Sequence, residues 1–511
     1  MTYYNMRKDT LRNIRWVVLA LLFTIHSSLF ISEAQAQPKR EFRGAWIQCV
    51  NGQFKGLPTL EMQQTLAYQL DELKKDGCNA IIFQVRPECD ALYTSRLEPW
   101  SYYLTGQQGR APRPYWDPLQ WMIEQCHQRG MELHAWINPY RAKTKVAHTL
   151  ASNHIANRYP ERCFEYDGLT LLNPAVKENR DFICEVVGDI VTRYDVDGMH
   201  IDDYFYPYPI AGIDIPDSAF FRASDEGYQD IGDWRRHQVD LFVEQLYKTV
   251  HDIKPWVKVG ISPFGIYRNK KNDPNGSRTN GLQNYDQLYA DILLWDEQGW
   301  MDYCVPQLYW EIGHKAADYD ELIHWWNDNT HKTNLYIGED VERTVKHPDA
   351  QQPQRHQLAA KRALHDALPN VKGTVLWYAK AAVDNIGNYG TSLRNKYWKY
   401  PALQPTTPWI DDKAPRKPRK LKLMEMEGKK VLFWTAPKGK KWNDVAVKYV
   451  VYRFDKGEKL NIDDPAKIVA ITSNTYLELP DQPRKTRHVY VVTALDRMQN
   501  ESDIVKKKVK Y

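Results

Sequence analysis

Short apolar runs alternate with longer amphipathic stretches over most of the chain. The short runs are rich in β-branched and aromatic residues, and the stretches between them, such as Leu60–Lys75 and Val176–Tyr194, carry apolar residues at helical spacing. Strands that alternate with helices form parallel sheet, because each parallel connection needs a crossover. The predicted strands are Phe42–Val50, Ala80–Val85, Glu132–Asn138, Gly198–Asp202, Lys258–Ser262, Tyr303–Tyr309, Leu335–Gly338 and Thr374–Tyr378.

Eight strand–helix units in succession predict an α/β fold, a (β/α)₈ or TIM barrel, over residues 40–400. A doubly wound open sheet is the alternative. That fold would need a Gly-rich phosphate-binding turn after the first strand, and none follows Val50. Helix signals agree with the boundaries, since Asp117-Pro118 is typical of a helix start and Arg129-Gly130 of a helix end.

Beyond residue 400 the pattern changes to strands alone. A Pro-rich linker is expected over residues 401–418, and β-rich runs recur about every twenty residues in 419–511. This spacing predicts a small all-β sandwich domain after the barrel. The placement of Trp434, Tyr449, Tyr452 and Tyr490 resembles a fibronectin type III domain.

The N-terminus carries an export signal. Basic residues precede the apolar run Trp16–Ile25, and Ala34-Gln35-Ala36 supplies a small-x-small cleavage pattern. These features predict a secretory signal peptide over residues 1–36 and a periplasmic or cell-envelope location. The run is short for a membrane span, so no stable insertion is expected after cleavage, although an uncleaved anchor is the alternative.

Composition adds two points about partners. The net charge is +5, and part of the excess lies in Arg416–Lys420 and Lys506–Lys508. A solvated basic C-terminal module is the expected reading, with attraction to an anionic polymer or surface as the alternative. No basic face is interleaved with aromatics, so nucleic acid is not an expected partner. The 18 Trp and 32 Tyr suit sugar rings, which have apolar faces and a polar rim.

Polar residues follow the predicted strands at their C-terminal ends, where barrels of this kind place their active sites. Side chains alternate along a strand, so one face should carry His134, Trp136 and Asn138, and another His200 and Asp202. Burying a polar group inside the barrel costs free energy unless the group is hydrogen-bonded or solvated. The occurrence of such residues at the ends of most of the predicted strands therefore predicts a functional site. The predicted substrate-binding residues are Gln84, Arg86, His134, Trp136, Asn138, Arg141, His200, Gln307, Tyr309, Trp310 and Trp377.

A carboxylate pair is the expected chemistry, because cleaving a glycosidic bond takes one acid and one base or nucleophile. Asp202 is the favoured actor, with a structural acceptor role as the alternative. Alternation places Asp203 on the opposite side, as a loop residue. The second carboxyl group must come from another strand. Glu311 is slightly favoured, because it lies two residues after Tyr309 and so should share its inward face. The predicted catalytic set is Asp202, Glu311, Asp203 and Asp90, with Glu88 and Glu339 as further candidates.

No metal or other cofactor is expected. His134, His200 and Asp202 come from adjacent strands, but no H-x-H or H-E-x-x-H pattern accompanies them, so hydrogen bonds to substrate hydroxyls are the preferred interpretation. Arg86 and Arg141 suit either an anionic group on the glycan or a structural ion pair.

Several motifs in order carry a family resemblance. They are Phe42–Trp46, Gln84–Pro87, Asp90–Tyr93, Glu98–Ser101, His134–Arg141, Asp197–Tyr204, Ser262–Ile266 and Pro306–Trp310. Together they resemble the glycosyl-hydrolase-like family 10 barrels from Phe42 to Tyr378. The resemblance implies a TIM barrel, export to the bacterial envelope and hydrolysis of a polysaccharide, with peptidoglycan strands lacking stem peptides linked to some relatives. Glu88-Cys89 departs from the commoner small or neutral pair, which puts Glu88 in doubt as a shared group.

The sequence therefore predicts an exported glycoside hydrolase that acts on a polysaccharide. A non-catalytic glycan-binding protein on the same scaffold and a metal-dependent deacetylase or other hydrolase are the alternatives.

Overall fold

The computed structural model describes residues 37–511, so the predicted signal peptide lies outside the described residues. In that part of the chain no helix combines the length and apolarity that crossing a bilayer requires. All seven cysteines are free thiols, and six of them are buried.

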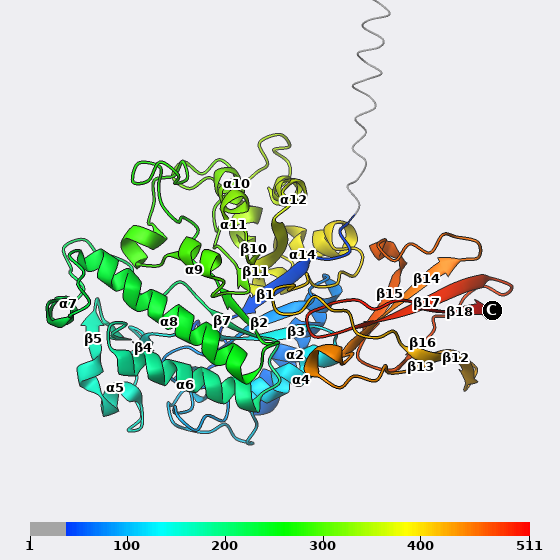
Figure 1. The fold of residues 1–511 in the computed structure, drawn as a ribbon, viewed down its shortest axis with the longest axis horizontal. Helices are drawn as coiled ribbons and strands as arrows, with labels where there is room; N and C mark the ends of the chain where they lie inside the picture. Colours follow the sequence, from blue (N-terminus) through cyan, green and yellow to red (C-terminus); the bar gives the residue numbers. More distant parts are fainter. Residues whose placement is uncertain (1–36) are drawn as a thin grey trace, which may run out of the picture. The chain divides into compact units, whose positions relative to one another are not determined.

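Eight parallel strands close into a barrel, which confirms the predicted fold class (Figure 1). Each strand pairs in parallel with its two neighbours, and β1 closes the ring by pairing with both β2 and β11. Around the ring the strands are β1 (Phe42–Ile47), β11 (Val371–Trp377), β10 (Asn334–Asp340), β9 (Tyr303–Cys304), β8 (Lys258–Ile261), β7 (Gly198–Ile201), β3 (Glu132–Ile137) and β2 (Ala80–Arg86).

Helices surround the barrel, and their apolar faces pack on the outward side chains of the strands in one large core. The start signal at Asp117 works as expected, because its carboxylate accepts a hydrogen bond from the backbone N–H of Gln120. The α-helices are α2 (Thr59–Lys75), α3 (Tyr102–Thr105), α4 (Pro118–Gln128), α5 (Ile155–Arg158), α6 (Lys177–Arg193), α7 (Ser218–Ala223), α8 (Ile231–Ile253), α9 (Ile292–Gln298), α10 (Tyr319–Asn329), α11 (Val341–Lys346), α12 (Leu358–Ala367), α13 (Ala379–Val383) and α14 (Tyr389–Ser392).

Two inward-facing glycines make room for polar rings inside the barrel. A Cβ atom on Gly260 would lie 1.8 Å from the Tyr303 ring, and one on Gly198 would lie 2.4 Å from His134 Nδ1. Any larger residue at either position would displace its ring. Because Gly198 and Gly260 have no Cβ atom, the rings of His134 and Tyr303 have room to meet at the barrel axis.

Several strands end earlier than predicted, and two of these ends change the interpretation of the site. Strand β9 stops at Cys304 rather than Tyr309, and Pro306, which has no N–H to donate, lies just beyond it. Strand β7 stops at Ile201, so Asp202 and Asp203 both lie past its end. The side chains of these carboxylates and of the residues after Pro306 therefore do not follow strand alternation.

The C-terminal region forms two antiparallel sheets, which confirms a second, all-β domain. One sheet has the order β12 (Arg419–Met426), β13 (Lys429–Thr435) and β16 (Tyr476–Glu478), and the other β15 (Ile468–Thr472), β14 (Lys448–Asp455), β17 (Arg487–Leu495) and β18 (Val505–Lys510). Their shared core contains Trp434, Tyr449 and Tyr490.

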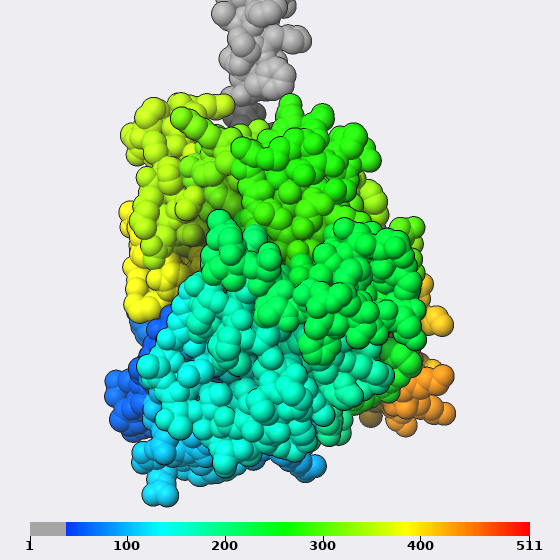
Figure 2. All heavy atoms as spheres, turned by 90° about the vertical axis from the view of Figure 1, so that its left-hand side faces the viewer, coloured from blue at the N-terminus to red at the C-terminus, as the bar shows by residue number. Residues whose placement is uncertain are grey.

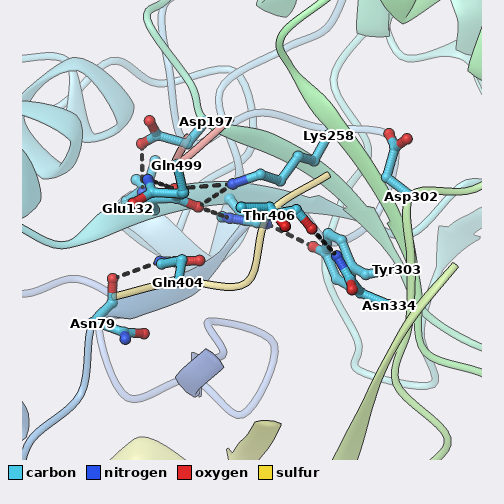
Figure 3. Close-up of polar contacts among 12 residues, drawn as sticks. Asn79, Glu132, Asp197, Lys258, Asp302, Tyr303, Asn334, Gln404, Thr406 and Gln499 are labelled. Atoms are coloured by element: carbon cyan, nitrogen blue, oxygen red, sulfur yellow. Dashed lines mark hydrogen bonds and ion pairs between the residues drawn. The ribbon is translucent and has the colours of Figure 1, made fainter. Parts of the chain in front are cut away.

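The linker and the sandwich both contact the N-terminal end of the barrel (Figure 3). Gln404 Nε2 donates to the carbonyl of Asn79 at 2.9 Å, and Gln499 Nε2 donates to Glu132 Oε1 at 3.0 Å. The predicted linker is thus held against the barrel at Gln404, which is buried.

Candidate functional site

The loops that follow the barrel strands gather on one face of the molecule, opposite the sandwich (Figures 1 and 2). The loop after β3 folds into a small antiparallel sheet of β4 (Arg141–Lys143), β6 (Leu169–Leu172) and β5 (Cys163–Tyr166). Figure 2 looks onto this face, which we call the mouth. The predicted site lies here.

Asp202 is buried at the mouth among neutral donors. Its carboxylate accepts hydrogen bonds from Trp136 Nε1 at 3.1 Å and from Asn138 Nδ2 at 3.1 Å. Burial raises the pKa of Asp202, while the charge of Arg141 and these hydrogen bonds oppose the rise. The structure thus brings four predicted site residues together, and Arg86 is not among the partners of Asp202.

Asp203 lies in the same buried site, which corrects its expected place on the opposite side. Tyr208 donates its hydroxyl to Asp203 Oδ2, and Gln307 Nε2 donates to Asp203 Oδ1 at 3.2 Å. Burial and then the negative charge of Asp202 raise the pKa of Asp203 to about 7. Strand alternation did not apply, because the chain has already left β7.

The two carboxyl groups differ in their charged surroundings. Arg141 acts on Asp202 and has its guanidinium 5.4 Å from the centre of the Tyr204 ring. Asp203 accepts only from a phenol, an amide and backbone, and it feels the charge of Asp202. Like charges at close range cannot both form cheaply, so ionisation of one carboxyl group opposes ionisation of the other.

Aromatic side chains line the barrel interior beside this pair. Tyr309 stacks on Trp377 with ring centres 5.8 Å apart and planes 20° from parallel. Trp46 and Trp136 meet Trp377 edge-on at 6.1 and 6.3 Å. Tyr309 and Trp377 are partly exposed, so their stacked rings offer an apolar surface to a sugar. Trp310, also partly exposed, packs edge-on against Phe264 at 5.4 Å.

A chain of buried hydrogen bonds runs down the barrel axis below the mouth. Trp46 Nε1 donates to His200 Nε2 at 3.2 Å, and His200 Nδ1 lies 3.1 Å from the Tyr303 hydroxyl. That hydroxyl lies 2.7 Å from His134 Nδ1, whose ring then reaches Glu132 through Nε2 at 3.1 Å.

Trp46 and Glu132, at the two ends of this series of hydrogen bonds, determine which atom donates in each bond. Trp46 can only donate and an ionised Glu132 can only accept, so His200 carries its proton on Nδ1 and His134 on Nε2. Burial, reinforced by His134, keeps the pKa of His200 well below its usual value, so the ring is neutral. His134 therefore has no free nitrogen for a substrate hydroxyl, contrary to its predicted role. His200 reaches the mouth only through Trp46 and Ser262 Oγ, the latter at 3.2 Å.

Three other predicted residues stabilise loops at the mouth. Arg86 is fully buried in an ion pair with Glu98, at 2.6 Å between Nη2 and Oε1, which matches the structural alternative. Asp90 accepts from the Tyr102 backbone and from Gln108 Nε2 at 3.1 and 3.0 Å. Gln84 Oε1 accepts from the backbone N–H groups of Cys49 and Val50, both at 3.0 Å. Their polar atoms hold backbone in place, and all three side chains are buried.

The other carboxylate candidates also lie apart from the pair. Glu311 follows the shortened β9 and pairs with Arg343 at 3.4 Å. Glu339 is buried and accepts from the Tyr389 hydroxyl at 2.8 Å, which places it on the helix side of β10. Glu88 accepts from the backbone of Thr144. None of these three has a hydrogen bond to Asp202 or Asp203 among those of residues 37–511.

Sequence patterns did not identify Tyr208 as a residue of the site. It lies in a loop with no periodicity, so no pattern could have placed it beside Asp203. The sequence indicates Asp340 as a polar residue at the end of the seventh strand without a role, and the structure has it at the end of β10, two residues after the inward Gly338. Burial raises the pKa of Asp340, and its side chain caps α11 at the Arg343 N–H. Within residues 37–511 no three potential metal ligands converge.

Comparison with known proteins identifies the family. Residues 41–357 match the model of the family described as "Glycosyl hydrolase-like 10". The glycosyl hydrolase YngK of Bacillus subtilis is 38% identical over 490 residues, which cover 93% of this chain and 95% of the relative. The glycosyl hydrolase DigH of Escherichia coli (strain K12) is 37% identical over 333 residues, covering 62% and 75% of the two chains.

Among solved structures, the glycoside hydrolase domain of PgaB from Bordetella bronchiseptica aligns with 70% of this chain and 99% of its own, at 13% identity and a TM-score of 0.44. The family match spans most of the barrel, and YngK matches the sandwich region as well. The chain belongs to the glycosyl hydrolase-like 10 family and is a glycoside hydrolase.

Proposed function

We propose that this glycoside hydrolase is exported and cleaves a polysaccharide of the bacterial cell envelope, with peptidoglycan strands that lack stem peptides as its substrate. The signal-peptide pattern of residues 1–36 supports export. The resemblance of the barrel motifs to envelope glycan hydrolases supports the substrate.

The carboxylate pair carries the mechanistic proposal. Asp203 holds a proton near neutral pH, because burial and Asp202 raise its pKa to about 7. It acts as the general acid that protonates the oxygen of the leaving sugar. Asp202, which Arg141 helps to keep ionised, faces the positive charge that develops on the sugar ring.

The aromatic rings provide the binding surface in this proposal. The stacked Tyr309 and Trp377 take the apolar face of one sugar, and Asn138 and Gln307 orient the carboxylates beneath it. Arg141 lies at the same site and is partly exposed, so it can also meet an anionic group on the glycan.

The sandwich is proposed to be a fibronectin type III-like module. Its three-stranded and four-stranded antiparallel sheets support this assignment. It has no role in the chemistry of the pair.

The test is glycan cleavage by the chain from Gln37 onward. Peptide-free peptidoglycan strands, intact peptidoglycan and neutral chitin are incubated with wild type, Asp203→Asn and Asp202→Asn, and new reducing ends are counted. Glu311→Gln is the matched control, since it removes a mouth carboxylate outside the pair. We expect release from peptide-free strands by wild type and the control only.

Three results would contradict the proposal. Equal release by Asp203→Asn and wild type would remove Asp203 as the acid. Loss of activity in Glu311→Gln, with its fold intact by circular dichroism, would make Glu311 the missing catalytic carboxylate. Tight binding of the strands without any new reducing end would exclude them as the substrate.

A further inference from the structure

Five cationic side chains of the sandwich converge on one surface hollow. Lys506, Lys508 and Lys510 come from β18, Arg487 from β17, and Lys456 from the turn after β14. The hollow has a volume of about 700 Å³, and all five side chains are exposed. The three strands lie next to one another in the four-stranded sheet (Figure 1). We call this hollow the basic groove.

Strand register explains why the cations share one face. Side chains alternate along a strand, so Lys506, Lys508 and Lys510 point to the same side of β18. Lys510 lies opposite Arg487 in the antiparallel ladder, and Lys508 lies opposite Val489. The row of three lysines spans about 14 Å at the usual rise per residue. Such a row fits an extended polymer better than a single small ion.

The positive charge of the groove is not neutralised within the protein. None of the five cations has an ion pair among the described residues, whereas Glu458, the acid that lines the groove, is paired with Lys467. Like charges directly opposite each other on neighbouring strands destabilise a sheet. Arg487 and Lys510 therefore cost stability unless an anion lies between them.

Protection of a sheet edge explains only part of this arrangement. β18 is the edge strand of its sheet, and lysines on edge strands prevent unwanted pairing with other chains. Arg487 and Lys456 belong to inner strands and their turn, where no edge needs protection. Their convergence with the β18 lysines indicates a ligand.

The lining of the groove favours a polysaccharide over a lipid surface. The cations that line the groove are exposed, whereas its large apolar residues are not: Leu460 and Val489 are partly buried, and Val509 is buried. A membrane-binding surface would add exposed large apolar side chains to the cations. Met424, Met426 and Tyr476 are such residues, but they belong to the other sheet, on β12 and β16.

We propose that the basic groove binds an acidic polysaccharide chain whose sugars carry carboxylates, and that it holds this chain while the barrel cleaves it. The proposal rests on the proposed function, because a glycan strand without stem peptides exposes a carboxylate on every second sugar. The groove would thus be a second binding site on the same substrate polymer, separate from the mouth. It raises the local concentration of polymer at the barrel.

Binding is measured with the full mature chain carrying Asp203→Asn, so that the polymer survives. The variant Lys506→Gln/Lys508→Gln/Lys510→Gln is compared with Lys438→Gln/Lys440→Gln/Lys441→Gln, which removes three exposed lysines from another part of the sandwich. The probes are peptide-free peptidoglycan strands and neutral chitin. We expect the groove variant to lose about tenfold in affinity for the acidic strands only, and the control to lose little.

The outcomes separate this inference from the proposed function. If both variants weaken equally, or if neither weakens, the groove does not bind the polymer, whatever the activity of wild type. Binding of wild type to vesicles of anionic lipid, abolished in the groove variant, would assign the groove to a membrane and overturn the proposal. Wild-type activity on short soluble fragments should be unchanged by the groove variant, which shows that the catalytic pair works independently.

Discussion

Glu132 and Asp197 at one end of the barrel and the pair of Asp202 and Asp203 at the other have hydrogen-bond partners of opposite kinds. At the N-terminal end, which we call the base, two acids have cationic or potentially cationic partners. The buried Glu132 bonds Lys258 at 2.8 Å (Figure 3). The partly buried Asp197 bonds His127 at 2.8 Å. At the mouth, the side chains that donate hydrogen bonds to Asp202 and Asp203 are all neutral.

Their pKa values separate accordingly. Burial alone would raise the pKa of Glu132, but the charge of Lys258 and the hydrogen bond of His134 lower it to about 2. Burial and Asp202 raise the pKa of Asp203 to about 7. Burial is thus common to both ends, and the nearest partner decides whether a carboxyl group is a fixed charge or a proton donor. On the proposed function, the base serves stability and the mouth serves chemistry.

The largest expected effect is on catalysis at the mouth. Replacing Asp203 with Asn keeps the shape and removes the proton, so kcat should fall by about 10²- to 10⁴-fold, as for loss of a general acid. The melting temperature should stay the same or rise near pH 7, because a buried acid that resists ionisation is replaced by a neutral amide. Activity assays and thermal melts on the same sample test both. A large fall in melting temperature would mean that the mouth also serves stability.

The next largest effect is expected on stability, from loss of the ion pair between Lys258 and Glu132 at the base. Replacing Lys258 with Met leaves Glu132 as a buried acid without a cationic partner and should cost about 3–5 kcal/mol in the free energy of unfolding. Urea unfolding measures this loss. The double variant Lys258→Met/Glu132→Gln should recover part of it, because no uncompensated charge remains. No recovery would show that packing of the lysine, rather than its charge, holds the base.

The third prediction concerns pH and separates the two ends. Asp203 must be protonated to act, so kcat/KM should fall as pH rises through about 7. The hydrogen bond from Tyr208 lowers the pKa of Asp203, so Tyr208→Phe should move this fall to higher pH. The linked stability is greatest below the unfolded pKa near 3.8 and declines as pH rises toward 7. A pH–rate profile that is the same in Tyr208→Phe would exclude Asp203 as the titrating group.

The stability contribution of Glu132 at the base depends on pH in the opposite sense to that of Asp203. The folded pKa of Glu132 is lowered, so its stabilising contribution is present above about 4.5 and is lost as pH falls through about 2. Unfolding of Lys258→Met should therefore depend less on acid pH than unfolding of wild type. Urea titrations at pH 3 and pH 7 compare the two.

Periodicity predicted the barrel because eight apolar runs each bury a whole strand, and that signal is local. It also located Trp136 inside β3, and it brought attention to Asn138 and Asp202 as polar residues that directly follow β3 and β7. Periodicity misplaced Asp203 and Glu311, because side chains alternate only while the chain stays in a strand. The hydrophobic pattern does not show that β7 ends at Ile201 or that β9 ends before Pro306. The ion pairs of Arg86 and Glu132 join residues through space, so no spacing could reveal them.

The smallest expected effect tests how far the base depends on the sandwich. Gln499 reaches from the sandwich to Glu132, whose other partners are Lys258 and His134. Replacing Gln499 with Leu removes one hydrogen bond to a charged group and should cost about 1.5–3 kcal/mol or less, since Lys258 remains. Activity on short fragments should be unchanged, because the mouth lies at the far end of the hydrogen-bonded chain through His134 and His200. A changed pH–rate profile in Gln499→Leu would show instead that the chain couples the sandwich to the mouth, and that the two ends are not independent.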